Sequence, residues 1–60
     1  MNTPFLERHL AVLQMKHYLS LQQSAIVTGD HNEHRRVAAM LDKLVSEYGV
    51  QALRQAQEEL

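Results

Sequence analysis

The stretch of the sequence with the densest set of chemically active side chains is VTGDHNEHRR, residues 27–36. His31 and His34 are three residues apart, so on a helix they could share a metal ion, with Asp30 or Glu33 adding an oxygen ligand. A stable zinc site needs three or four ligands, and the usual helical signature places two histidines four residues apart. The stretch has neither that spacing nor a clear third ligand. We therefore expect no metal ion and no other cofactor.

A turn between two helices explains the same residues. Gly29 suits the left-handed conformation that ends a helix, and Asp30 can cap the next one. Glu33 lies three residues after the cap, where an acid favours the positive end of the helix dipole. We interpret Gly29-Asp30 as the turn of a helical hairpin, and the chain's four histidines as scattered side chains rather than a pH switch.

Two adjacent arginines, Arg35 and Arg36, could bind phosphate or the acidic side chains of a partner. They stand in the first turns of a predicted helix, where the dipole is unfavourable for cations, which hints at such a use. The plainer interpretation is a solvated helix face with Glu33 or Asp42 nearby.

A DNA-binding helix-turn-helix is a second hypothesis, because Gly49 separates two short helical segments. The second segment would read DNA through Arg54 and several glutamines. The same segment carries Glu58 and Glu59, and the chain has six Lys and Arg against seven Asp and Glu. Phosphate contacts dominate affinity for DNA, and few are available here. In this alternative, the residues that contact the nucleic acid are Arg35, Arg36 and Arg54.

Catalytic signatures are missing from the sequence. It has no cysteine, no glycine-rich phosphate loop and no serine–histidine pair with a visible acid. A hairpin this small also rarely forms a pocket of the size that enzymes use. We therefore expect a protein that is not an enzyme.

Proline and glycine mark the helices that must position these side chains. Thr3 is a good N-cap and Pro4 a good first helical residue, and no breaker follows until Gly29. This pattern predicts a helix over 4–27. A second helix is predicted over 31–48, before the second glycine.

The last segment of the chain, VQALRQAQEEL, consists of good helix formers. It is predicted as a short third helix, or as a continuation of the second helix past a bend. One apolar stripe along it holds Val50, Leu53, Ala56 and Leu60. The fold class is therefore all-α: a helical hairpin plus a short C-terminal helix, in one domain over residues 1–60.

The two long helices differ in how their apolar residues are arranged. The helix over 31–48 has one apolar face, formed by Val37, Leu41, Leu44, Val45 and Tyr48 with Met40 at its edge. The helix over 4–27 has two stripes on opposite sides. The first stripe holds Leu6, Leu10, Leu13 and Leu21, the second holds Val12, Met15, Leu19 and Ile26, and Tyr18 bridges the two.

A helix that is apolar on two sides needs covering on two sides, and one hairpin partner covers only one. A chain of 60 residues without cysteine also needs support from metal or oligomerisation. We therefore expect a symmetric homodimer that forms a helical bundle. In one alternative the C-terminal helix folds back over the second stripe, which its few large side chains disfavour. In another, that stripe docks a different protein.

The most fitting function is a small protein–protein interaction module, a regulator, adaptor or inhibitor that occupies a partner's surface. Small bacterial or phage regulators share this general build, a comparison that rests on fold analogy alone. We expect a cytoplasmic protein, because it lacks cysteine and its least charged stretch, residues 17–29, is too short and too polar to span a bilayer. The expected interface residues are Leu6, Leu10, Val12, Leu13, Met15, Tyr18, Leu19, Leu21 and Ile26.

Overall fold

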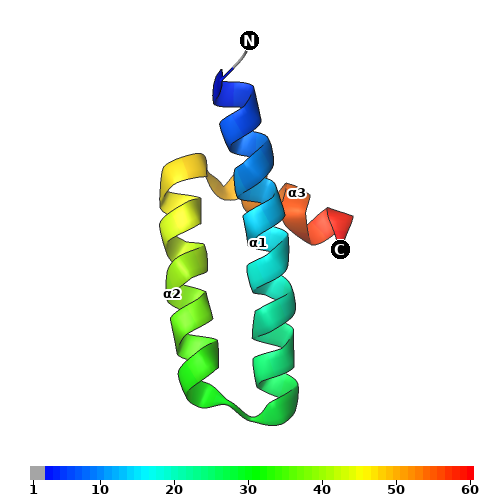
Figure 1. Ribbon diagram of the computed structural model, residues 1–60, viewed down its shortest axis with the longest axis vertical. Helices are drawn as coiled ribbons and strands as arrows, with labels where there is room; N and C mark the ends of the chain where they lie inside the picture. Colours follow the sequence, from blue (N-terminus) through cyan, green and yellow to red (C-terminus); the bar gives the residue numbers. More distant parts are fainter. Residues whose placement is uncertain (1–2) are drawn as a thin grey trace.

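The computed structural model describes residues 3–60 of the chain, with side chains from residue 5 onward. This part is helical, without a strand, and comprises α1 (Thr3–Thr28), α2 (His31–Tyr48) and α3 (Val50–Glu59). Figure 1 shows α1 and α2 side by side as an antiparallel hairpin, with α3 crossing behind α1. The all-α prediction is confirmed, and the last segment is a separate helix. The proposed cap at Thr3 and Pro4 involves side chains outside the described residues.

The turn between α1 and α2 has the geometry that the sequence predicts. Gly29 has a φ of 74°, in the left-handed region. Its N–H donates to the carbonyl of Ile26 at 3.2 Å, and the N–H of Asp30 donates to that of Ala25 at 2.9 Å. These two bonds form a Schellman motif, which satisfies carbonyls at the end of α1. The Asp30 carboxylate accepts the N–H of Glu33 at 3.0 Å, so the predicted cap of α2 is confirmed.

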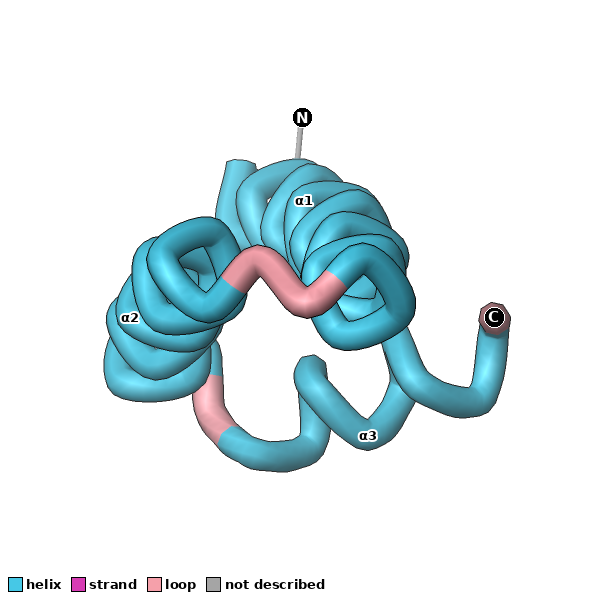
Figure 2. The backbone as a smooth tube through the Cα atoms, turned by 90° about the horizontal axis from the view of Figure 1, so that it is seen from below, coloured by secondary structure: helices cyan, strands magenta, loops and turns pink. Residues whose placement is uncertain are grey.

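The turn between α2 and α3 is a single residue, Gly49, with a φ of 94°. Its N–H donates to the carbonyl of Val45 at 2.8 Å and closes the last turn of α2. The chain then changes direction so sharply that α3 leaves the axis of α2. Figure 2 shows α3 on one side of the layer formed by α1 and α2, with no helix of residues 3–60 on the other side.

The core lies where the three helices meet. The predicted face of α2 is confirmed: Val37 and Leu41 are buried, and Leu44, Val45 and Tyr48 pack against them half-buried. The buried cluster as a whole consists of Val12, Met15, Val37, Leu41, Ala52 and Ala56. Two of these residues come from each helix, so one chain builds a core without a partner.

Part of the second stripe of α1 is covered by α3, whereas Ile26 at its end is 64% exposed. Val12 and Met15 are 2% and 0% exposed and share their cluster with two fully buried alanines, Ala52 and Ala56. We expected that α3, with few large side chains, would not fold back over α1, and this prediction was wrong. The alanines of α3 let it approach α1 closely, and the large side chain of Met15 fills the space between the two helices.

The buried face of α3 also differs from the predicted stripe. Val50 and Leu60, which the stripe included, are 60% and 65% exposed. Leu53 is half-buried and Ala52 replaces Val50 in the core. The two small residues four apart set the rotation of α3, because only their side of the helix can lie close to α1 and α2.

Candidate interaction surface

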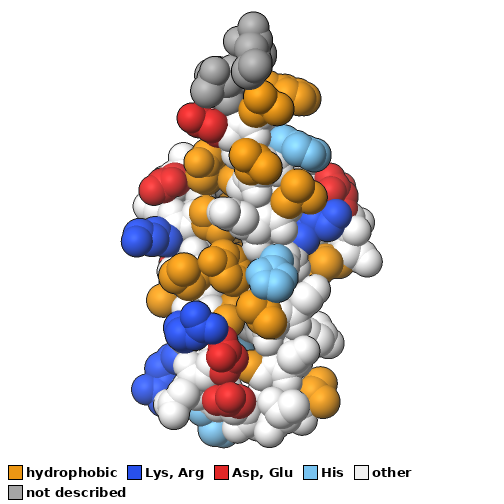
Figure 3. All heavy atoms as spheres, in the orientation of Figure 1, with side chains coloured by type: hydrophobic (Ala, Val, Ile, Leu, Met, Phe, Trp, Pro, Cys, Tyr) orange, Lys and Arg blue, Asp and Glu red, His pale blue; other side chains and the backbone are white. Residues whose placement is uncertain are grey.

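A row of leucines lies along α1 on the side away from α3. Leu6, Leu10 and Leu13 are 44%, 57% and 44% exposed. Their spacing of four and then three residues places them on one stripe, as in the seam of a coiled coil. Figure 3 views the face without α3 and shows hydrophobic side chains gathered along α1 and beside α2. Since exposed apolar side chains that form one patch mark contact sites, this leucine row is the first part of the candidate surface.

A groove between α1 and α2 adjoins the leucine row. It has a volume of about 320 Å³ and is lined by Gln14 and Tyr18 of α1 and by Met40, Lys43, Leu44 and Glu47 of α2. Tyr18 and Leu44 are half-buried and form an apolar floor, whereas Met40 is 38% exposed at the edge. Neither Lys43 nor Glu47 joins an ion pair within residues 5–60. The groove therefore combines an apolar floor with charges that are free to bind.

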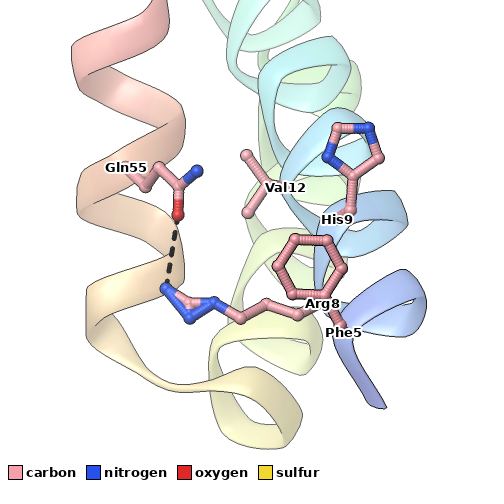
Figure 4. Close-up of a pocket in the computed structure, with 5 residues that line it drawn as sticks. All are labelled: Phe5, Arg8, His9, Val12 and Gln55. Atoms are coloured by element: carbon pink, nitrogen blue, oxygen red, sulfur yellow. Dashed lines mark hydrogen bonds between the residues drawn. The ribbon is translucent and has the colours of Figure 1, made fainter. Parts of the chain in front are cut away.

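Polar contacts attach α3 to α1 on the opposite side. Figure 4 shows Phe5, Arg8 and Val12 of α1 beside Gln55 of α3. These residues line a small hollow of about 80 Å³, where a guanidinium nitrogen of Arg8 donates to the Gln55 side-chain oxygen at 3.3 Å. Further along, Lys16 Nζ lies 3.3 Å from a carboxylate oxygen of Glu59. Hydrogen bonds from Gln55 and then from Lys16 lower the pKa of Glu59 below its ordinary value. These contacts fix α3 in place and do not contribute to the leucine row.

The histidines of the turn line a third hollow. His31 and His34, with Ala25, Ile26 and Gly29, surround about 260 Å³ at the closed end of the hairpin. The described residues contain no group of three His, Asp or Glu side chains that could hold a metal ion. The region instead exposes two apolar side chains, Ile26 at 64% and Val27 at 78%.

The three arginines suggested as partner or nucleic-acid contacts are not gathered on one helix. Arg36 pairs with the carboxylate of Glu33, one turn earlier in α2. The N–H of Asp30 already donates to the carbonyl of Ala25, so the carboxylate of Glu33 is left to pair with Arg36. Arg35 is exposed near the hairpin turn and Arg54 is exposed on α3.

The expected interface residues divide into three groups. Val12 and Met15 are core residues of one chain and are not available to a partner. Tyr18, Leu19 and Leu21 are half-buried against that core. Those left at the surface are Leu6, Leu10, Leu13 and Ile26.

Met40, Lys43 and Glu47, which line the groove, were missing from the predicted interface. Phe5 was also not predicted and is 68% exposed near the start of α1, but it lies on the side of α3, beside Arg8 and Gln55. One signal in the sequence points to them: the helix predicted over 4–27 is longer than that over 31–48. In an antiparallel hairpin closed by a tight turn, the start of the longer helix must extend past its partner.

No protein-family model matches the chain, and comparisons with curated proteins and with solved structures found no match. Among the described residues, none of the helices combines the length and the apolar character that crossing a membrane requires.

Proposed function

We propose that this chain is a small protein–protein interaction module that acts as a homodimer through apolar helix faces. The observation that carries the proposal is the exposed leucine row, Leu6, Leu10 and Leu13, on the face that α3 leaves uncovered. About half of the surface of each of these leucines lies in water, so each forgoes about half of the roughly 1.5–3 kcal/mol that full burial of a leucine brings. A second copy offers the same stripe and can cover it.

A second protein is the target of such a dimer in this proposal. Ile26 and Val27 lie at the closed end of the hairpin, far along the chain from the leucine row, and both are exposed. They offer apolar contacts for a partner whose surface the module occupies as a regulator, adaptor or inhibitor. Without cysteine, the module suits the reducing cytoplasm.

The proposal is tested by molar mass from light scattering on a size-exclusion column over a range of concentrations. We expect twice the 6.9 kDa of one chain. Leu10→Asp should give a folded monomer, because it places a charge in the middle of the leucine row. Gln23→Asp adds the same charge at an exposed position of α1 outside the row and should stay dimeric. A wild-type mass of one chain at every concentration would refute the homodimer.

The rival function is a dimeric DNA-binding regulator that uses α3. It draws support from the outward side of that helix, where Gln51, Arg54 and Gln57 are exposed. Binding to duplex DNA would weaken steeply as salt rises, whereas apolar docking to a protein would not. Fluorescence anisotropy with a labelled duplex at low and high salt separates the two functions.

A further inference from the structure

We infer that the first turns of α1 from a second copy of this chain dock in the α1–α2 groove, reciprocally, in an antiparallel two-fold dimer. The inference rests on the proposed homodimer and specifies its register. The docking segment is residues 5–10, here named the overhang, because α1 continues past the end of α2. Figure 1 shows the first turns of α1 extending past the end of α2.

The overhang follows from the lengths of the two helices. With 26 residues in α1 and 18 in α2, and about 1.5 Å of rise per residue, α1 is longer by roughly 12 Å. The groove sets the register of the hairpin, since Gln14 and Tyr18 face the segment from Met40 to Glu47. Residues before Ala11 therefore have no part of α2 beside them.

The overhang exposes two residues of the leucine row, Leu6 and Leu10, which are 44% and 57% exposed. Phe5 lies on another side of the helix, beside the hollow between α1 and α3. Only Arg8 reaches another helix by a hydrogen bond, to Gln55 of α3 on the far side. An amphipathic helix end of this kind binds by laying its apolar side into an apolar groove.

The groove and the overhang are complementary within a two-fold dimer. If the two α1 helices pack antiparallel with Leu10 against Leu13 of the second copy, the overhang of each chain lies over residues 13–18 of the other, which border the groove. A two-fold axis perpendicular to α1 keeps both α2 helices on the same side. The side of the overhang that has no α2 of its own is thereby placed next to α2 of the second copy.

Charge supports the same register. Glu7 is seven residues before Gln14 and thus on the stripe of α1 that faces the groove side. In the described register Glu7 lies beside Lys43 of the second copy, and the two-fold axis repeats the pair. Neither side chain has an ion-pair partner within residues 5–60 of its own chain. The dimer therefore joins two opposite charges that one chain leaves apart.

A charge exchange tests this register. Glu7→Lys and Lys43→Glu each turn two attractive pairs of the dimer into repulsive ones, so we expect each to raise the dimer dissociation constant about tenfold at low salt. An equimolar mixture of the two variants regains both pairs across one heterodimer, and its dissociation constant should return close to the wild-type value. Glu58→Lys is the matched control on α3 and should have no effect, while circular dichroism checks that each variant is helical.

Disulfide trapping measures the same proximity without relying on charge. The chain has no cysteine, so Glu7→Cys mixed with Lys43→Cys should give a covalent heterodimer under mild oxidation, whereas Glu7→Cys mixed with Gln57→Cys should not. The register would be overturned if the wild type is a dimer, the two charge variants and their mixture have the same dissociation constant, and no disulfide forms between Glu7→Cys and Lys43→Cys. The homodimer itself would still stand. A wild-type monomer at every concentration would overturn both.

Discussion

Met15 of α1 and Ala56 of α3 have no exposed surface and lie in the same buried cluster. The methionine side chain fills space in the core, and the small alanine side chain lets the two helices approach closely. The longest helix, α1, therefore packs directly against the shortest, α3. Through this contact α3 is part of the core rather than an appendage. The contact also directs the opposite side of α1, with its leucine row, away from the core.

The contact between α1 and α3 predicts that Ala56 tolerates no larger side chain. Ala56→Leu should lower the free energy of unfolding by about 1–3 kcal/mol, because the added atoms meet a close-packed core. Gln57→Leu adds a similar side chain at an exposed neighbouring position and should change stability far less. Urea unfolding followed by circular dichroism measures both. Equal stability of the two variants would contradict the packing of α3 on α1.

The hairpin turn predicts that a substitution at Gly29 lowers the stability of the fold only through the backbone conformation required there. No atom lies within 4 Å of a Cβ added there, so the cost of substitution comes from the φ of 74° alone. Gly29→Val should destabilise the fold by about 1–2 kcal/mol, and Gly29→Asn by less, because asparagine tolerates the left-handed region. Thermal unfolding of the three proteins gives the order wild type, Asn, Val. A melting temperature of the Val variant equal to that of the wild type would rule out this account of the turn.

The lowered pKa of Glu59 predicts an acid-sensitive attachment of α3. A carboxyl group whose pKa falls on folding stabilises the fold above its unfolded pKa, and that contribution is lost as the pH drops through the folded pKa. The cause is the hydrogen bonds from Gln55 and then from Lys16. Stability should therefore fall from roughly pH 5 downward, and Glu59→Gln should flatten part of that fall. Glu58→Gln, at the exposed neighbouring position, should keep the wild-type profile.

Local features of the chain could be predicted from its sequence because they depend on neighbouring residues. Gly29 and Asp30 define the turn by their own backbone and side-chain chemistry, and the structure has that turn with its cap. The apolar face of α2 follows from a clear period in its residues. The three helices end within one or two residues of their predicted bounds for the same reason.

Only the tertiary structure decided which side of α1 belongs to the core. Both stripes are apolar, and periodicity ranks neither above the other. The choice depends on α3, whose two alanines bring it against Val12 and Met15 and leave Leu6, Leu10 and Leu13 uncovered. Small residues give a weak signal in a sequence, because their effect is to shorten the distance at which two helices can pack. That distance exists only once the chain has folded, and it determines the surface that this protein presents.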